Sequence, residues 1–337
     1  MKKLRIGIAG LGRLGKVHAQ NIAFKIPNAE LTAACSIMPA ELEYAKNELG
    51  VTDVYTDYKE MLAKADIDAV VIVTTSSEHC WQIEAALDAG KHVFSEKPLG
   101  VDVDQCKQAE AAVERHPDLT FMLGFMRRYD KSYSYAKKQI EAGAIGTPYL
   151  VKATGIDPEA FVDGAIRFAK TSGGIFLDMA IHDIDLMRWF LGCEATEVYA
   201  MGATFKHPEF KEAGDDETGV AVYKFENGAM GMVHVGRTAP YGYHVETEIV
   251  GTEGTIRISA VPEKNLAKIY GPNGVCTECV GSFPERFEEA YLIEMEEFVN
   301  CTLAGTKPGT TVYDGTKSTA IGYATTEAWR TGKIVKL

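Results

Sequence analysis

The sequence predicts an α/β protein with two domains, a doubly wound parallel sheet followed by an α+β domain with an open, mostly antiparallel sheet. Short apolar segments alternate with helical segments up to about residue 124, which is typical of a parallel sheet covered by helices on both faces. Beyond that point, strands follow one another through turns such as Asn227-Gly228, which favour antiparallel pairing. The predicted domains are residues 1–123 and 124–337, with the last helix expected to pack back on the first domain.

Composition limits the classes of function. The chain has 337 residues and a formal net charge of −12, which argues against non-specific binding to nucleic acid or to an anionic membrane. No apolar run approaches the roughly 18 residues that a transmembrane helix needs. The seven cysteines are scattered, as expected for reduced thiols in a cytoplasmic protein. Cys276-x-x-Cys279 is attributed to chance in a loop region, because no second Cys or His pair stands at zinc-like spacing, and no metal is predicted.

The first domain is predicted to contain six strands with helices between them. A Thr75-Ser-Ser-Glu78 capping box is expected to open the helix that ends at Ala89. The predicted strands are Leu4–Ala9, Leu31–Cys35, Val54–Tyr55, Ala69–Val73, His92–Phe94 and Phe121–Gly124.

A glycine-rich turn, Gly10-Leu-Gly12-Arg-Leu-Gly15, lies between the first strand and the first helix. In a Rossmann dinucleotide-binding domain, the first glycine permits the tight turn and the second lets the backbone approach the pyrophosphate. The third allows close packing of helix and strand. The N–H groups of the following helix then face the phosphates. The segment therefore predicts a bound NAD or NADP, with Arg13 and Leu14 also in the loop.

The end of the second strand bears on the choice between NAD and NADP. An acid usually stands there to bind the ribose of NAD, but this chain has Ser36. With Arg13 in the glycine loop, the missing acid removes repulsion of a 2′-phosphate and favours NADP or the use of both cofactors. The alternative is that Arg13 is only a solvated surface charge.

Glu96-Lys97-Pro98 follows the fifth strand, at the sheet edge where such domains bind ligands. Pro98 restricts the backbone of Lys97 to an extended form, which gives its side chain a defined direction. Lys97 is therefore a candidate functional residue, although an exposed loop lysine is the simpler interpretation.

The second domain is predicted from a helix ending near Ala142, a run of strands and two late helices. The strands are Tyr149–Thr154, Glu197–Phe205, Gly219–Phe225, Ala229–Gly236, Tyr243–Val250 and Thr255–Ser259, and the late helices are Phe287–Leu303 and Asp314–Arg330.

One segment of this domain combines apolar residues with ionisable ones. After Gly173-Gly174, a single helix is predicted to run to about Phe190 with apolar side chains nearly all round, as in a buried helix. Asp178, His182 and Asp185 would share one face of it. Burial of ionisable groups is costly unless they are paired or used. The stripe therefore predicts a site, the alternative being a buried ion-pair stripe that only fixes packing.

Together these motifs resemble the glucose–fructose oxidoreductase/inositol dehydrogenase (Gfo/Idh/MocA) family. The resemblance rests on Gly10–Gly15, on Glu96-Lys97-Pro98 and on the spacing Gly173-Gly174-x-x-x-Asp178-x-x-x-His182-Asp183-x-Asp185. Further segments resemble the inositol dehydrogenase branch, namely Gly124-Phe-Met-Arg-Arg-Tyr-Asp130, Tyr241-Gly-Tyr243 and Glu285-Arg-Phe287.

The resemblance implies roles for individual residues. The implied catalytic set is Lys97, Asp178 and His182. The implied substrate pocket is lined by Met126, Arg127, Asp157 and Tyr243. Asp185, in the polar stripe, is a further candidate contact for a polyol hydroxyl, and Thr74, Glu96 and Lys97 are further candidates for the cofactor site. The family also implies assembly through the open sheet, as a homotetramer or a dimer.

The predicted reaction is oxidation of one secondary alcohol of a cyclic polyol, most simply inositol. His182 would be the general base, since imidazole titrates near neutral pH. Asp178 would orient it, and Lys97 would hydrogen-bond the reacting oxygen. One alternative is another sugar dehydrogenase of the family. Another is a dinucleotide-binding regulator without turnover, which would be expected to lose Lys97 or His182.

Overall fold

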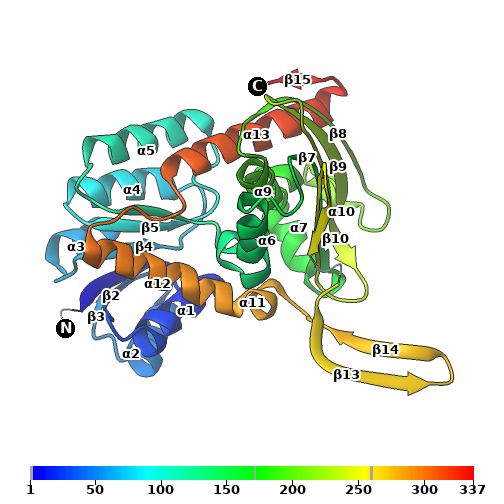
Figure 1. The fold of residues 1–337 in the computed structure, drawn as a ribbon. Helices are drawn as coiled ribbons and strands as arrows, with labels where there is room; N and C mark the ends of the chain where they lie inside the picture. The colour runs from blue at the N-terminus through cyan, green and yellow to red at the C-terminus, as the bar shows by residue number, and fades with distance from the viewer. Residues whose placement is uncertain (1–2, 171, 259–260) are drawn as a thin grey trace. The chain divides into compact units, whose positions relative to one another are not determined.

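The computed structural model describes residues 3–170, 172–258 and 261–337. The chain forms two compact units, coloured along the sequence in Figure 1. Unit 1 comprises Met1–Tyr129 and Glu289–Thr319, and unit 2 comprises Asp130–Glu288 and Ala320–Leu337. The division differs from the predicted boundary after residue 123, because a late segment returns to unit 1.

Unit 1 is built on a six-stranded parallel sheet in the order β3-β2-β1-β4-β5-β6. Strand β4 is buried along its whole length, as expected for a parallel sheet covered on both faces. This confirms the predicted doubly wound sheet. The strands are β1 Leu4–Ala9, β2 Ala29–Cys35, β3 Asp53–Tyr55, β4 Ala69–Ile72, β5 His92–Glu96 and β6 Phe121–Gly124.

Helices cover both faces of this sheet, with α1, α2 and α12 on one side and α4 and α5 on the other (Figure 1). They are α1 Arg13–Gln20, continued by a π-helical turn at Asn21–Lys25, α2 Pro39–Leu49, α3 Tyr58–Lys64, α4 His79–Asp88, α5 Val103–Arg115 and α12 Glu288–Ala304. The predicted capping box at residue 75 is wrong. Helix α4 starts at His79 after Glu78, whose side chain forms no capping hydrogen bond, and the carbonyl of Thr75 accepts from the Glu78 N–H in a turn.

Helix α12 explains why a late segment belongs to unit 1. The ring of Tyr291 meets His18 of α1 edge-on at 5.6 Å, and Phe298 meets Phe94 of β5 at 5.8 Å. These aromatic contacts bury the apolar side of α12 against unit 1. Sequence periodicity located the helix well but could not show against which sheet it packs.

Helix α12 also carries a fully buried glutamate into this core. Glu294, His18 and Glu96 form a buried group. One ring nitrogen of the histidine and one carboxylate oxygen of each glutamate lie within 4.8 Å of one another. His18 Nε2 and Glu96 Oε1 are 2.7 Å apart, whereas neither carboxyl oxygen of Glu294 has a hydrogen-bond partner among the described residues. Burial, reinforced by the charges of Glu96 and Glu297, raises the pKa of Glu294 well above its usual value. Burial therefore favours the protonated, neutral form of the Glu294 carboxyl.

Unit 2 contains a seven-stranded sheet in the order β12-β11-β7-β10-β9-β8-β15. All pairs are antiparallel except β7 with β10, which confirms the mostly antiparallel prediction. The strands are β7 Pro148–Pro158, β8 Ala195–Ala203, β9 Thr218–Phe225, β10 Met230–Ala239, β11 His244–Gly251, β12 Thr255–Ile258 and β15 Val335–Lys336. Of the predicted strands, the last included Ser259, which lies outside the described residues.

Helices α6, α7 and α9 lie on one side of this sheet (Figure 1). The helices are α6 Lys131–Glu141, α7 Val162–Ala169 after a 3-10 turn at Glu159–Phe161, α8 Ile175–Asp178, α9 Ile181–Leu191, α10 Glu209–Glu212, α11 Phe283–Arg286 and α13 Val312–Thr331, within which the unit boundary falls. Among the residues that the structure describes, no helix has both the length and the apolar character needed to span a bilayer.

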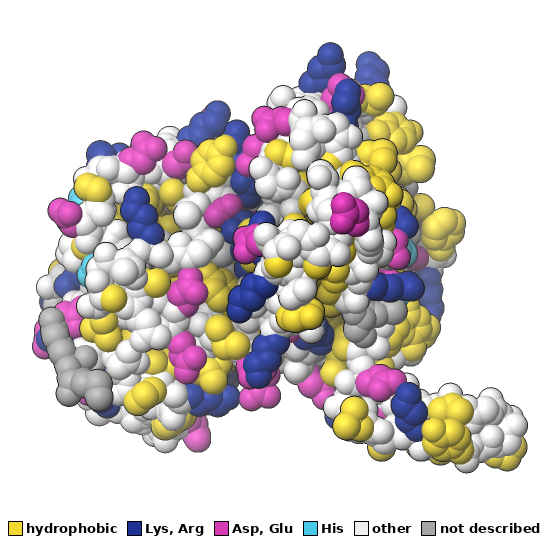
Figure 2. All heavy atoms as spheres, viewed as in Figure 1, with side chains coloured by type: hydrophobic (Ala, Val, Ile, Leu, Met, Phe, Trp, Pro, Cys, Tyr) yellow, Lys and Arg dark blue, Asp and Glu magenta, His cyan; other side chains and the backbone are white. Residues whose placement is uncertain are grey.

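The other face of the sheet leaves apolar side chains exposed. Val222 of β9 and Met232 of β10 are register partners, and both are more than one third exposed. Val220 and Met230 lie on the same face, as the alternation of the two strands requires. Figure 2 shows hydrophobic side chains along this side of the unit, where Figure 1 draws β8 to β10. A bare apolar sheet face of this kind is typical of an interface.

A β-hairpin that the sequence did not predict extends from unit 2. Its strands, β13 Glu263–Gly271 and β14 Gly274–Cys279, pair only with each other among the described strands. Leu266 and Tyr270 are almost fully exposed, at 94% and 79%. The prediction that Cys276 and Cys279 lie in a loop is wrong, since both are on β14. The missed signal was the turn sequence Pro272-Asn273-Gly274.

Replacement of Glu294 by Gln is expected to stabilise the protein at alkaline pH. The folded state binds the proton of Glu294 more tightly than the unfolded chain, so wild-type stability falls as pH rises above the ordinary pKa of 4.5. Gln has no proton to lose, so the variant avoids this fall. A gain of about 1 kcal/mol would raise the unfolding midpoint by about 2–4 °C.

Thermal unfolding of wild type and Glu294→Gln at about pH 5 and about pH 8 measures the difference. Glu296→Gln, on the same helix but partly exposed, is the matched control. If the difference in unfolding midpoint between Glu294→Gln and wild type is no larger at about pH 8 than at about pH 5, the prediction that Glu294 is buried in its protonated form is contradicted.

Candidate active site

The glycine loop of unit 1 has the shape that a dinucleotide requires. Gly10 has a φ of +89°, and a Cβ there would lie 2.4 Å from the carbonyl oxygen of Val73. A Cβ on Gly15 would lie 2.1 Å from the carbonyl oxygen of Gly10, whereas one on Gly12 would meet only Glu41 Oε1, at 4.0 Å. The loop is therefore closed toward the sheet and open beside Gly12, the side from which a pyrophosphate approaches.

Helix α1 begins directly after this opening. Gly12 is its N-cap residue, and no side chain caps its first N–H groups. These groups can therefore receive a phosphate. Arg13 is exposed and Leu14 half-buried at the start of the helix, so both lie where the sequence predicted a cofactor contact.

A carboxylate lies at the end of β2 although the sequence has none there. Ser36 donates from Oγ to Glu41 Oε2 at 2.6 Å, and the same oxygen accepts from the N–H of Leu11 in the glycine loop at 3.1 Å. Glu41 comes from the first turn of α2. The inference that the cofactor site lacks an acid, drawn from Ser36 alone, is therefore wrong.

The ends of β4 and β5 carry three more predicted residues. Thr74 donates to Gln82 Oε1 at 2.6 Å, and Lys97 is half-buried before a cis peptide bond to Pro98. Glu96 faces the protein interior, where it contacts His18 and accepts from the N–H of Lys97 at 3.1 Å. Because the side chain of Glu96 is engaged in these contacts, the predicted contact with the cofactor would be made by its backbone.

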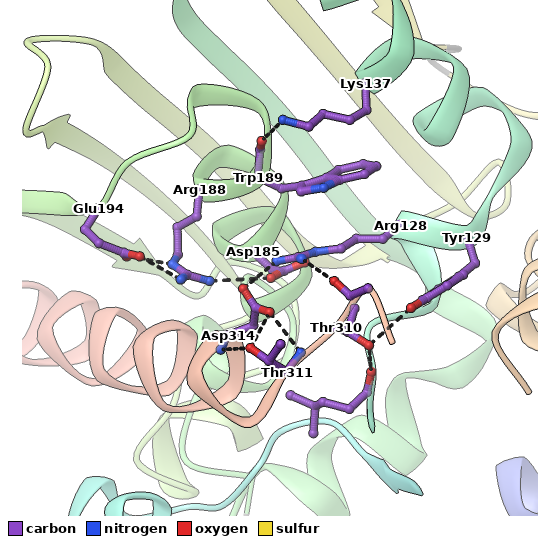
Figure 3. Close-up of polar contacts among 12 residues, drawn as sticks. Arg128, Tyr129, Lys137, Asp185, Arg188, Trp189, Glu194, Thr310, Thr311 and Asp314 are labelled. Carbon is purple, nitrogen blue, oxygen red and sulfur yellow. Dashed lines mark hydrogen bonds and ion pairs between the residues drawn. The ribbon is translucent and has the colours of Figure 1, made fainter. Parts of the chain in front are cut away.

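Met126 and Arg127 lie in a 3-10 turn, Met126–Tyr129, that directly follows β6. Both are buried. The turn is held within unit 1 by its next two residues, since Arg128 donates to Asp314 Oδ1 at 2.9 Å and Tyr129 Oη lies 3.3 Å from Thr310 Oγ1 (Figure 3). The predicted substrate residues are thus fixed at the end of a sheet strand.

The predicted single helix after Gly173-Gly174 is broken in the structure. Helix α8 ends at Asp178, residues 179–180 form a turn, and α9 starts at Ile181. Both glycines have positive φ, at +81° and +95°, which sets the entry into α8. Because the two helices are separate, the predicted common face of Asp178 and His182 does not follow from helical spacing.

Asp178 is held by a residue that the sequence did not single out. Arg237 of β10 is 2% exposed, and its Nη1 donates to Asp178 Oδ2 at 3.0 Å. Its Nη2 donates to Asp215 Oδ2 at 3.5 Å, and Asp215 Oδ1 accepts from the N–H of Ile175 at 2.9 Å. Burial raises the pKa of Asp215, and the charge of Arg237 opposes that rise. The two carboxylates therefore anchor both ends of α8 to one guanidinium.

The sheet register places Asp157 of β7 and Arg237 of β10 near the same strand ends. His244 of β11 is paired with Ile156 of β7. Tyr243 directly precedes β11, and its N–H donates to the carbonyl oxygen of Val280 at 2.9 Å. In the parallel pair of β7 with β10, Ile156 is the partner of Gly236, which places Arg237 near the same strand end. Tyr243 is buried and its ring meets Phe287 edge-on at 6.3 Å.

Helix α9 carries His182 and Asp185 at buried positions. Asp185 Oδ1 lies 3.7 Å from Arg188 Nη1, and Arg188 forms two hydrogen bonds of 2.7 Å with Glu194 (Figure 3). Lys137 of α6 donates to the carbonyl oxygen of Trp189 at 2.8 Å. The helix is thus fixed by polar contacts at its C-terminal half, and Asp185 has a structural partner as well as its predicted substrate role.

Sequence reasoning missed Glu41 and Arg237. Each acts through a contact between elements distant along the chain, so no local motif contained it. The available signal for Arg237 was its place as the one lysine or arginine in the strand Met230–Ala239.

Family comparison agrees with both units. Residues 4–125 match the oxidoreductase family with an NAD-binding Rossmann fold, and residues 133–257 match the GFO/IDH/MocA C-terminal domain. The chain belongs to the Gfo/Idh/MocA oxidoreductase family. This confirms the resemblance inferred from the motifs.

Relatives match along the whole chain. The scyllo-inositol 2-dehydrogenase (NAD(+)) of Bacillus subtilis is 36% identical over 335 residues, covering 99% of this chain and 96% of its own. The crystal structure of scyllo-inositol dehydrogenase from Lactobacillus casei, with bound NAD(H) and scyllo-inositol, is 48% identical with a TM-score of 0.97, covering 99% of both chains. The structure of myo-inositol 2-dehydrogenase from Lactobacillus plantarum is 41% identical with a TM-score of 0.97, covering 100% of both chains.

Replacement of Arg237 by Leu is expected to lower the free energy of unfolding by about 3–5 kcal/mol, because it leaves a buried carboxylate without its counter-charge. Urea unfolding near neutral pH measures the loss. The double variant Arg237→Leu/Asp215→Asn should recover part of it, since the new amide would keep an acceptor for the Ile175 N–H without the charge. A loss below about 1 kcal/mol for the single variant would contradict a buried, mutually dependent charge set.

Proposed function

We propose that this protein oxidises one secondary alcohol of inositol to a ketone with NAD as cofactor, and that scyllo-inositol is a better substrate than myo-inositol. The main support is the 48% identity to the Lactobacillus casei scyllo-inositol dehydrogenase, whose structure holds both NAD(H) and scyllo-inositol. The residues that such a reaction needs are all present in this chain. Identity is lower, at 41%, to the myo-inositol 2-dehydrogenase of Lactobacillus plantarum.

NAD, when bound, accepts the hydride from the alcohol carbon. The residues of this chain handle the proton and the substrate. His182, which is buried, removes the hydroxyl proton as general base, a role for which imidazole is the usual side chain. Lys97, half-buried at the end of β5, donates a hydrogen bond to the reacting oxygen and stabilises the charge that develops on it.

Asp178 has a changed role relative to the sequence prediction. Its hydrogen bond to Arg237 fixes its carboxylate from the side of the sheet, so its position does not depend on a helix shared with His182. We assign Asp178 to the catalytic set as the acid that stabilises the protonated imidazole of His182.

A polyol offers several hydroxyl groups, each both donor and acceptor. In unit 2, Asp157 of β7, Tyr243 before β11 and Asp185 on α9 provide partners for them. The roles of Met126 and Arg127 in substrate binding stay predictions. Such a mixture of fixed acceptors and donors suits a sugar-like ligand better than an apolar one.

The decisive assay follows formation of reduced nicotinamide by absorbance with NAD and scyllo-inositol, myo-inositol or glucose. We expect turnover with both inositols, faster with scyllo-inositol. His182→Ala should lower kcat roughly 10²- to 10⁴-fold with cofactor binding unchanged, whereas His116→Ala, a half-exposed histidine beside Asp88, should match wild type. Near-normal turnover of His182→Ala, or activity with glucose alone, would contradict the proposal.

We also propose a homotetramer assembled through the open sheet of unit 2. Support comes from the exposed apolar side chains of β9 and β10 and from the exposed hairpin β13–β14, since contiguous exposed apolar side chains are typical of interfaces. All seven cysteines are free thiols, which supports the cytoplasmic location expected from the sequence.

Light scattering on the purified protein tests the assembly. Wild type is expected at four times the chain mass, and Val222→Lys/Met232→Lys at a lower multiple, because facing lysines cannot be buried without partners. Phe24→Ser, an exposed apolar position in unit 1, is the control and should leave the mass unchanged. A monomeric wild type would contradict the proposal.

A further inference from the structure

A glutamate of α2 occupies the position from which Rossmann domains bind the ribose of NAD. In such domains the acid follows the second strand directly, where this chain has Ser36. Here Glu41 reaches back from the next helix to that strand end, where Ser36 donates to its Oε2 at 2.6 Å. Ser36 also accepts from the N–H of Met38 at 3.0 Å. Ser36 therefore supplies no carboxylate itself but positions the carboxylate of Glu41.

The same carboxylate is attached to the glycine loop. Glu41 Oε2 accepts from the N–H of Leu11 at 3.1 Å, and the N–H of Gly10 donates to the carbonyl oxygen of Cys35 at 2.9 Å. The loop that receives the pyrophosphate and the strand end that receives the ribose are therefore joined through Glu41. This explains how the acid can stand five residues further along the chain and still face the cofactor.

Its second oxygen faces the open side of the loop. Oε1 lies 4.0 Å from where a Cβ of Gly12 would stand, and that Cβ would meet nothing else within this distance. Among the described residues, Oε1 takes part in no hydrogen bond and no lysine or arginine forms an ion pair with Glu41. One carboxylate oxygen is therefore directed, with its negative charge uncompensated, at the side of the loop where the adenosine half of the cofactor binds.

We propose that Glu41 is the residue that selects NAD over NADP, by accepting hydrogen bonds from the adenosine ribose hydroxyls and repelling a 2′-phosphate. The inference deepens the proposed function, on whose use of NAD it rests. It reverses the expectation drawn from Ser36 and Arg13. Arg13 is exposed beside the loop, yet any attraction it offers a 2′-phosphate is opposed by a carboxylate fixed nearer the strand end.

An alternative role for Glu41 is purely structural, as a link between loop and strand. The two roles predict different results. A structural link supports binding of either dinucleotide equally, because both share the pyrophosphate and the nicotinamide half. A selecting acid acts only where the two cofactors differ, at the ribose 2′ position.

Direct titration of the free protein with NADH and with NADPH, followed by nicotinamide fluorescence, separates these roles without any turnover. Wild type is expected to bind NADH about 10- to 100-fold more tightly than NADPH. Glu41→Gln keeps the shape and the acceptor for Leu11 but removes the charge. It should weaken NADH binding and strengthen NADPH binding, so that the ratio of the two dissociation constants falls about tenfold or more.

Glu48→Gln, an exposed glutamate on the same helix, is the matched control and should keep the wild-type ratio. A second variant, Glu41→Asp, keeps the charge and should retain preference for NADH even if both affinities fall. Equal weakening of both cofactors in Glu41→Gln, or tight NADPH binding by wild type, would overturn the proposal. Because no polyol is present, failure of the inositol assay would leave this result intact.

Discussion

The buried guanidinium of Arg237 is the interaction on which the architecture of unit 2 depends. A charge that is 2% exposed is tolerable only if carboxylates surround it. Asp178 and Asp215 supply them, and Asp215 also binds the first N–H of α8. The short helix α8, too short to be stable by itself, is thereby fixed at both ends to the sheet. The same constraint places Asp178 at the strand ends that carry Asp157.

In unit 1 the ionisable groups at unexpected positions are acids, whereas the buried charge of unit 2 is that of an arginine. Acids appear at two places where an apolar core or a neutral loop would be simpler, at Glu294 in the core and at Glu41 beside the glycine loop. The first is accommodated by a raised pKa, because the charges that act on it from the described residues are those of other carboxylates. The second is accommodated by hydrogen bonds from Ser36 and Leu11 and by partial exposure. A buried acid and a surface acid thus differ in what they can do, since only the second offers its charge to a ligand.

Much of the fold could be predicted from sequence because its signals are local. The glycine turn, the apolar parallel strands and the alternation in β9 and β10 each depend on neighbouring residues, and each appears where expected. The break between α8 and α9 could not be predicted, since residues 175–190 contain neither Gly nor Pro. Asp178, the last residue of α8, is held by Arg237 of β10, a tertiary contact of the kind that can override helix propensity and that no local pattern shows. The same limit applied to Glu41 and to the packing of α12, where partners lie far apart in sequence.

Fixed acceptors matter for a substrate whose isomers differ little. Scyllo- and myo-inositol have the same atoms and differ in the orientation of one hydroxyl group, so discrimination requires partners that cannot move to suit both. Residues carried by strands meet that requirement better than residues on loops. Asp157 lies on β7, and Asp178 is held by Arg237 of the adjacent strand β10. In the proposed function, a hydroxyl in the wrong orientation would leave one of these groups without its hydrogen bond, and a group fixed on the scaffold could not move to restore it.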